Sequence, residues 1–261
     1  MNQQVFEATR PDDYLLRLAA SDLGRSYKSL ALSELRVSRG DTVLDLGCGP
    51  GTDLASFADA VGVEGVVIGL DHDPCAVARA TAETERLSQV EVRQGDIHVL
   101  DLADDSIDHA HTDRVLQHVA DPAAVLTETV RVLRPGGTVV LAEPDWDTLM
   151  IDYPDPSVAR AYTSFVTNHV VRNACIGRQL SRLAIEGGFT IDKVVPITAV
   201  FRDAHAADKV LGLRRVTERA VSAGHLTAQE GQPWLDHLAT RPFFASVTLF
   251  VTVASVPASS R

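Results

Sequence analysis

The sequence contains little cysteine, and the arrangement of what it has excludes the usual cysteine-built sites. The three cysteines of the 261-residue chain, Cys48, Cys75 and Cys175, are odd in number, far apart and without a C-x-x-C pair. Disulfide frameworks use even numbers of cysteines, and structural zinc sites use closely spaced pairs. We therefore expect neither a disulfide framework nor a metal site, and a reducing, cytoplasmic location.

Long apolar runs and positive charge are also scarce. The chain opens MNQQVFEATRPDDYLL, with charges where a signal peptide needs an apolar core. No stretch approaches the ~18 apolar residues of a membrane span. The 24 Lys and Arg residues face 35 Asp and Glu residues, giving a net charge of −11. Because phosphate binding depends on clustered Lys and Arg, we expect neither a nucleic acid nor a membrane as partner. The sequence leaves open whether the chain forms a homodimer.

Aromatic residues make up only 5% of the chain, whereas apolar residues of all kinds make up 45%. A core built from Val, Leu and Ala suits a sheet covered by helices and does not suit a disordered chain. The length fits a single α/β domain with an insertion.

Strands and helices are predicted to alternate from residue 42 onward. The apolar runs TVLDLG, GVVIGLD, VEVRQGD, IDHAHT and TVVLAEP are separated by helical segments that begin at Thr52, Pro74 and Pro122. This order predicts right-handed crossovers and a mainly parallel sheet. Asp73 and Asp121 each precede a proline, which is typical of an aspartate N-cap with proline in the first helical position.

Four segments are predicted along the chain. Residues 1–39 form a helical N-terminal cap, 40–150 the ligand-binding core, 151–190 a helical lid, and 191–261 the C-terminal part of the sheet with a helical insertion. The fifth strand is expected to end at Pro144, after which the pattern changes. The lid is predicted as a long helical stretch from about Ser157 to Ile185, interrupted near Gly177. FASVTLFVTVASV reads as the last strand.

A glycine-rich loop follows the first predicted strand. The sequence VLDLGCGPG, residues 43–51, runs from a buried strand into a turn that opens a helix. Glycines there allow positive φ angles and a close approach of the backbone to a ligand. Asp71 lies 20 residues beyond Gly51, at the end of the second strand, where a carboxylate can accept both hydroxyls of a ribose. Asp96 ends the third strand beside Ile97, which can flank an adenine ring.

The details of this loop distinguish between nucleotides. Its spacing is G-x-G-x-G, not G-x-G-x-x-G, and Asp45 places a negative charge that repels pyrophosphate but suits an ammonium group. Ligands of open parallel sheets bind at the carboxyl ends of the strands, where Asp45, Asp71 and Asp96 all fall. We expect the backbone amides of residues 47–51 and these three carboxylates to recognise a zwitterionic amino-acid nucleoside and not NAD.

The motifs at 43–51, Gly95-Asp96 and RVLRPGG at 131–137 resemble those of class I S-adenosylmethionine-dependent methyltransferases, of the ubiquinone/menaquinone-biosynthesis-like subgroup (methyltransferase type 11). The resemblance spans about residues 40–145. It implies a Rossmann-like, seven-stranded, mainly parallel sheet with an antiparallel last strand and helices on both faces. It also implies S-adenosylmethionine as cofactor: Asp45, Gly47 and Gly49 line the methionine part, Asp71 the ribose, Asp96 and Ile97 the adenine, and Thr112, Asp113 and Arg114 the sulfonium side, with Cys48, Gly51 and His72 completing the set.

Methyl transfer is an in-line displacement, so alignment of the reactants and exclusion of water are the main requirements. A base helps only where the acceptor is a hydroxyl or an acidic carbon. The catalytic candidates are His118 after the fourth strand, Asp145 past the fifth and His169 in the lid, although a structural role is the commoner one for a histidine. His111, within the fourth strand, is predicted to pack.

Acceptor contacts are predicted from the cap, the rim and the lid. Trp146 is expected to stack on a flat acceptor. Tyr14, Arg172 and Arg178 are the other candidates. Thr112-Asp113-Arg114 lacks the Pro-Pro-aromatic motif that resembles nucleic-acid amino-methylating enzymes. A small-molecule acceptor is therefore expected, in secondary-metabolite or quinone-like biosynthesis, with oxygen, carbon or nitrogen as the acceptor atom.

Three alternatives remain open at this point. A protein of this fold can use the bound sulfonium electrostatically for a cyclisation or rearrangement, without methyl transfer. A nicotinamide-dependent oxidoreductase is disfavoured by the loop spacing and by Asp45. A regulator without catalytic activity is the third alternative, because fold does not fix function.

Overall fold

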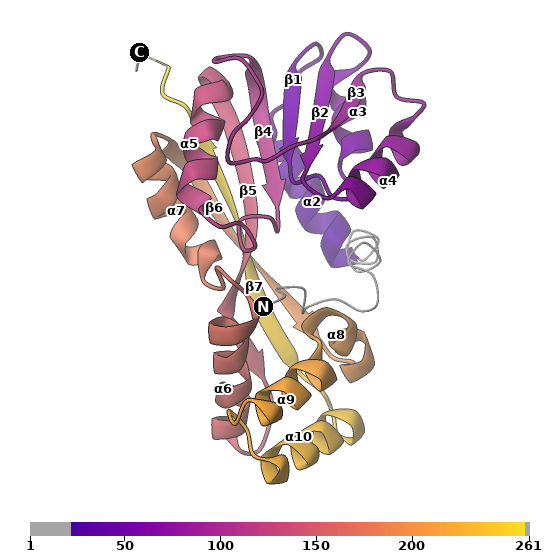
Figure 1. Ribbon diagram of the computed structural model, residues 1–261, viewed down its shortest axis with the longest axis vertical. Coiled ribbons are helices and arrows are strands. Elements are labelled where there is room, and N and C mark those ends of the chain that lie inside the picture. The colour runs from indigo at the N-terminus through magenta and orange to yellow at the C-terminus, as the bar shows by residue number, and fades with distance from the viewer. Residues whose placement is uncertain (1–21, 259–261) are drawn as a thin grey trace.

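The computed structural model describes residues 22–258, arranged as one seven-stranded sheet with helices on both faces (Figure 1). Tyr14 and the first part of the predicted cap lie outside these residues. The strands are β1 (Thr42–Leu46), β2 (Val66–Asp71), β3 (Val90–Gln94), β4 (Ile107–Asp113), β5 (Leu133–Ile151), β6 (Thr190–Phe201) and β7 (Ala245–Ser255). The helices are α2 (Asp22–Leu35), α3 (Leu54–Val61), α4 (Pro74–Thr84), α5 (Pro122–Val132), α6 (Pro156–Phe165), the π-helix η1 (Val166–Val170), α7 (Ile176–Gly187), α8 (Ala204–Leu211), α9 (Leu213–Ser222) and α10 (Ala228–Thr240).

The strand order is β3-β2-β1-β4-β5-β7-β6. The first five strands pair in parallel, and β7 pairs antiparallel with both β5 and β6. This confirms the predicted sheet with its antiparallel last strand. The order reverses at β1 and β4, and a crevice for ligands forms at such a switch point in open α/β sheets.

Two hydrophobic layers cover the sheet because successive strand residues point to opposite faces. Leu44 and Leu46 of β1 pack with α5 and α7, whereas Val43 packs on the other face with α2 and α3. Both predicted aspartate N-caps are confirmed: Asp73 accepts a hydrogen bond from the Cys75 amide, and Asp121 from the amides of residues 123 and 124. Each cap is followed by a proline, whose fixed φ suits the first helical turn.

Strands β5, β6 and β7 extend beyond the parallel part of the sheet into a second lobe that also contains α6, α8, α9 and α10 (Figure 1). The prediction that the fifth strand ends at Pro144 is wrong, since β5 continues to Ile151. β4 pairs with β5 only as far as Asp113 opposite Ala142. Beyond that point β5 lacks a partner on the β4 side, so the missing N–H of Pro144 breaks no ladder hydrogen bond.

The segment predicted as a lid, 151–190, divides between the two parts of the molecule. Helix α6 and η1 pack in the second lobe, whereas α7 covers the sheet beside α5. The helical interruption lies at 171–175, and Gly177 itself is inside α7. A Cβ at Gly177 would lie 2.9 Å from the Glu143 carbonyl oxygen, so this glycine lets α7 approach β5 closely. Between residues 22 and 258, no helix has the length and apolar character needed to cross a membrane.

Candidate active site

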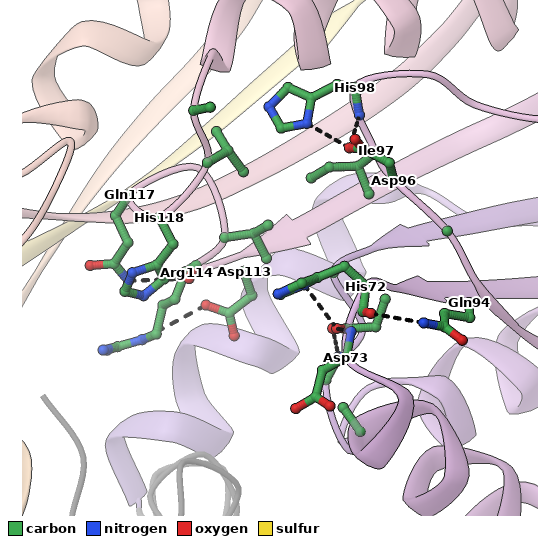
Figure 2. A pocket seen from close by; sticks show the side chains of 18 of the residues that line it. His72, Asp73, Gln94, Asp96, Ile97, His98, Asp113, Arg114, Gln117 and His118 are labelled. Carbon is green, nitrogen blue, oxygen red and sulfur yellow. Dashed lines mark hydrogen bonds and ion pairs between the residues drawn. The ribbon is translucent and has the colours of Figure 1, made fainter. Parts of the chain in front are cut away.

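A cavity of about 770 Å³ opens at the carboxyl ends of β1, β2, β3 and β4. Figure 2 shows its two walls, one built by His72, Asp73 and Asp96 after β2 and β3, the other by the segment from Asp113 to His118 after β4. Sites for small ligands have volumes of roughly 300–1,000 Å³, so the cavity can enclose a nucleoside-sized ligand together with part of a second molecule.

The glycine loop supports the floor of this cavity. Gly47, Gly49 and Gly51 have φ angles of 72°, 52° and 84°, a region that favours glycine. The expectation that the amides of residues 47–51 face the ligand is wrong. The amides of Gly47 and Cys48 donate to the Leu70 carbonyl, that of Gly49 to Asp71, and that of Gly51 to Cys48, while residue 50 is a proline without an N–H. The loop therefore offers space and a close backbone surface, and polar groups reach the cavity from carboxylates such as Asp71.

Gly47 also determines how closely the two walls approach each other. A Cβ at this position would lie 2.5 Å from Cγ2 of Val115, in the opposite wall. We expect Gly47→Ala to lower the stability by roughly 1–3 kcal/mol more than Gly40→Ala, because overpacking adds to the backbone strain that both substitutions share. Gly40 has a φ of 89° and nothing within 4 Å of its added Cβ. Denaturant unfolding of the two variants measures the difference, and equal losses would contradict the predicted clash.

Asp71, at the end of β2, lines the cavity and organises the loop above it. Its Oδ2 accepts a hydrogen bond from the Gly49 amide at 2.8 Å, and its Oδ1 accepts one from the Asp73 amide at 2.9 Å. The neighbouring His72 is exposed, with its Nδ1 3.4 Å from Oδ1 of Asp71. Each Asp71 oxygen has a lone pair left, so the carboxylate can also accept hydroxyls of a ligand.

Asp96 and Ile97 lie at the end of the wall that follows β3. Asp96 is exposed and its Oδ1 accepts a hydrogen bond from the His98 amide at 2.9 Å and contacts His98 Nδ1 at 2.6 Å. These hydrogen bonds from His98 lower the pKa of Asp96, which keeps it ionised. Ile97 is buried and offers an apolar surface to the cavity. Both residues therefore line the cavity, and their contact with an adenine stays a prediction.

Asp45 lies beneath the loop, not in the main cavity. It lines a small adjoining cavity of about 30 Å³ together with Cys48, and its Oδ1 lies 2.9 Å from Nδ1 of His111. Both side chains are buried, and His111 also makes an edge contact with Phe57. Burial opposes the charged form of His111, but the hydrogen bond and charge of Asp45 outweigh it and raise the pKa of His111. The predicted packing role of His111 thus includes an interaction with Asp45.

Helix α2 contributes two polar side chains that sequence reasoning missed. The Tyr27 hydroxyl donates to Oδ2 of Asp113 at 2.8 Å, and Lys28 Nζ donates to the same oxygen at 2.7 Å and to Asp53 at 2.5 Å. Burial alone raises the pKa of Asp113, but Lys28 and Arg114 outweigh this effect and hold it below its usual range. Tyr27 and Lys28 are 86 and 85 residues away from Asp113 in sequence, and no local pattern in the sequence indicates these contacts.

The second oxygen of Asp113 indicates which kind of ligand group fits the cavity. Oδ1 is buried and has no hydrogen-bond partner within the part of the chain that the structure describes, although Nε of Arg114 lies 3.9 Å away. Asp113 lines both the main cavity and the small one beneath the loop. An ionised carboxylate oxygen in this position suits a cationic ligand group, such as a sulfonium or an ammonium.

Of the three catalytic candidates, the structure places only His118 at the cavity. His118 is exposed at the cavity; partial loss of hydration there, together with Arg114, lowers the pKa of His118, so its imidazole is neutral near pH 7. Asp145 is fully buried and paired with Arg178, whose Nη1 also lies 3.0 Å from Asp147. His169 belongs to η1 in the second lobe, where it stacks on Phe165 and lies beside His225.

The acceptor-side predictions divide in the same way. Trp146 lines the main cavity, and its indole Nε1 donates to Oε1 of Gln117 at 2.8 Å. Arg172 and Arg178 do not line the cavity. Of the predicted cofactor residues, Thr112 and Gly51 do not line it either, since Thr112 is buried within the sheet. The cavity also includes side chains that the sequence analysis did not select: Asp73, Gln94, His98, Val115 and Gln117.

A small apolar cleft of about 20 Å³ shares the lining residues Arg114 and Trp146 with the cavity. It lies where the two lobes meet, and its other walls are Tyr27, Pro144, Ile197, Phe201, Val210 and Leu249, with small side chains between them. Arg114 is its one charged lining residue among residues 22–258. The main cavity, with carboxylates in its walls, suits a nucleoside with a cationic group.

Comparison with known proteins agrees with this chemistry. The profile of a methyltransferase-domain family matches residues 37–234. An uncharacterised protein from a transposon of Streptomyces fradiae is 60% identical over 256 residues, which cover 97% of this chain and 74% of that protein. Demethylmenaquinone methyltransferase of Oceanobacillus iheyensis is 34% identical over 128 residues, covering 48% of this chain and 54% of that enzyme.

The likeness extends to solved structures. A candidate methyltransferase of Bacillus halodurans superposes with a TM-score of 0.63 at 18% identity, covering 89% of this chain and 99% of that one, and this similarity shows the fold alone. The family match, the loop VLDLGCGPG and the acidic residues at the strand ends agree on one cofactor. The chain therefore belongs to the S-adenosylmethionine-dependent methyltransferases.

Proposed function

We propose that the protein transfers a methyl group to a small organic acceptor that lies in the main cavity beside Arg114 and Trp146. The observation that carries this proposal is the size of this cavity: at about 770 Å³ it can enclose the cofactor and still leave room for part of an acceptor. Bound S-adenosylmethionine supplies an activated methyl group on a sulfonium.

The chain's own residues orient both partners. Asp71 is positioned to hold ribose hydroxyls, Asp96 and Ile97 lie where an adenine would be held, and Asp113 presents a buried negative oxygen to a cation. Apolar lining residues of the cavity, among them Ile97, Val115 and Val119, exclude water from the acceptor and favour a productive orientation over random encounter.

Three side chains of the cavity are placed to contact the acceptor: the indole of Trp146, the imidazole of His118 and the guanidinium of Arg114. Trp146 offers an indole held in place by Gln117, suited to stacking on a planar acceptor. Neutral His118 can accept a proton from a hydroxyl or an acidic carbon of the acceptor. Arg114, at the junction of cavity and cleft, is placed to pair with an acceptor oxygen that becomes negative. These features favour planar, oxygen-bearing acceptors such as phenols or quinols.

The test has two stages, and the first needs no acceptor. We expect titration calorimetry to show binding of S-adenosylmethionine and S-adenosylhomocysteine and none of NAD, since the loop amides donate within the protein and the carboxylates of Asp71 and Asp113 line the cavity, which disfavours a pyrophosphate. Mass spectrometry then follows methylated product in a panel of phenols, quinols and polar amines. Equimolar S-adenosylhomocysteine must accompany product. Conversion of an acceptor without it would instead identify a cyclisation or rearrangement, and binding of NAD alone would contradict the proposal.

A further inference from the structure

Glu143, near the middle of β5, is a fully buried carboxyl group that does not line the cavity. Its Oε1 accepts hydrogen bonds from the backbone amides of Val115 at 2.7 Å and Leu116 at 2.5 Å. These two amides belong to the turn at residues 114–118, which follows β4. One side-chain oxygen of β5 thus holds the turn that forms a wall of the cavity.

This turn carries most of the acceptor-side groups. Arg114, Val115, Gln117 and His118 all line the cavity (Figure 2). Arg114 has a φ of 60°, in the left-handed region that is unfavourable for residues other than glycine. Such a conformation persists only where surrounding interactions fix it. The two hydrogen bonds to Glu143 follow this residue directly.

Other contacts hold the same turn through its carbonyl groups. Asn173 donates to the carbonyls of Leu116 at 2.8 Å and Val119 at 2.9 Å, and the Gln117 amide donates to the carbonyl of Arg114 at 3.2 Å. The amides of Val115 and Leu116 have Glu143 as their acceptor. Loss of the Glu143 side chain would leave both donors buried, and buried donors without acceptors are costly.

The surroundings of Glu143 disfavour its charged form. Its Oε2 is buried without a hydrogen-bond partner in the described part of the chain. The charged groups that affect Glu143 most are Asp113, at the end of β4, and Arg114, in the turn. On the neighbouring elements, Phe250 of β7 lies opposite Glu143, and Gly177 of α7 lies against its backbone. Burial raises the pKa of Glu143 to about 8, with Asp113 adding to the rise, whereas the two amides and Arg114 oppose it.

We propose that Glu143 is a positioning residue: its buried side-chain oxygen fixes the 114–118 turn, and through Gln117 also Trp146, so that the acceptor-side groups face the cavity. Gln117 connects the two parts because it lies in the turn and accepts the hydrogen bond of the Trp146 indole. The turn also packs Val115 against Gly47 of the cofactor loop. Glu143 therefore influences both the acceptor side and the cofactor side without contacting either molecule. The assignment of an acceptor side and a cofactor side rests on the proposed function.

Trp146 provides a reporter that needs no known acceptor. The chain has two tryptophans, and the other, Trp234, is buried in the second lobe. In a Trp234→Phe background, emission and acrylamide quenching report Trp146 alone. Three further variants are compared in that background, at a temperature where each is folded. They are Glu143→Ala, Glu143→Gln and, as a control at another fully buried position, Leu126→Ala in α5.

We expect Glu143→Ala to raise the quenching constant of Trp146 about twofold or more and to weaken S-adenosylhomocysteine binding about fivefold, because the turn loses its acceptor. Glu143→Gln keeps an oxygen for the two amides and should remain within about twofold of the background protein in both measurements. Leu126→Ala should lower the melting temperature while leaving both unchanged, since Leu126 does not line the cavity and its side chain makes no hydrogen bond to the turn.

The pH dependence of stability supplies a second, independent measurement. An acid whose pKa is raised in the folded state stabilises the fold at low pH, and this contribution is lost as the pH rises through the folded pKa. The melting temperature of Glu143→Gln, relative to the background protein, should therefore increase from pH 5 to about pH 8, the pKa of Glu143 in the folded protein, and level off above it. This comparison decides the matter even if Glu143→Ala does not fold.

The outcomes separate this inference from the proposed function. Unchanged Trp146 quenching in Glu143→Ala, a Gln variant as impaired as the Ala variant, or a pH-independent difference in melting temperature would each overturn the role of Glu143. Failure of the background protein itself to bind S-adenosylhomocysteine would overturn the proposed function, and the ligand-free quenching results would still test Glu143.

Discussion

Replacing Asp71 with alanine is expected to weaken binding of S-adenosylhomocysteine by a factor of about 5 to 150, equivalent to roughly 1–3 kcal/mol. Two effects add in this variant. The ligand loses a carboxylate that lines the cavity, and the amides of Gly49 and Asp73 lose their acceptor, so the glycine loop is less well held. Asp71→Asn retains an acceptor oxygen, so its affinity for S-adenosylhomocysteine should lie between those of the unmodified protein and Asp71→Ala.

Titration calorimetry measures this effect, and Asp59→Ala is a suitable control because Asp59 is exposed on α3 and does not line the cavity. We expect the control to bind the ligand like the unmodified protein. An Asp71→Ala variant that is folded and binds within about twofold would remove this carboxylate from the recognition of the cofactor, since a lost hydrogen bond to a charged group costs more than that.

Replacing Arg178 with alanine is expected to lower the free energy of unfolding by about 3 kcal/mol and the melting temperature by roughly 6–12 °C. Asp145 is fully buried, and Arg178 binds it through two nitrogens, with Nη2 2.9 Å from Oδ1. Without Arg178 the carboxylate stays buried and unpaired. We take the lower end of the range for buried pairs because the Arg178 side chain is half exposed, so water can partly replace it.

The same variant distinguishes a structural ion pair from a catalytic or substrate-binding one. Because neither residue lines the cavity, Arg178→Ala should bind S-adenosylhomocysteine normally at temperatures where it is folded. The double variant Asp145→Leu with Arg178→Leu should regain much of the lost stability, because it leaves no uncompensated buried charge. A loss of methyl transfer in Arg178→Ala, at unchanged stability and unchanged S-adenosylhomocysteine binding, would restore the sequence-based prediction that Asp145 is catalytic and Arg178 contacts the acceptor.

The part of the site that sequence predicted best depends on local pattern. The loop at 43–51 and the acids at 71 and 96 each follow a strand with its own apolar run, and parallel strands bring their carboxyl ends to one edge. Their neighbourhood follows from topology alone. The direction of backbone amides does not, and the loop amides were assigned to the ligand although they donate within the protein.

The part that sequence predicted poorly depends on distant contacts. Lys28 reaches Asp53 and Asp113 only because α2 packs across the sheet, which no nearby residue indicates. Asp145 was selected as catalytic because it follows a strand at the expected edge, yet the antiparallel pairing with β7 continues past it and its side chain is buried. His169 was placed on a lid, but η1 packs within the second lobe.

The continuous passage of β5, β6 and β7 through both lobes has a mechanical consequence. A lobe attached by a flexible connector can swing about it, whereas here a swing would bend three hydrogen-bonded strands at once. The strand ladders thus restrain the orientation of the two lobes. Side chains along the far ends of these strands could then be exchanged with the nucleoside half of the enzyme left untouched.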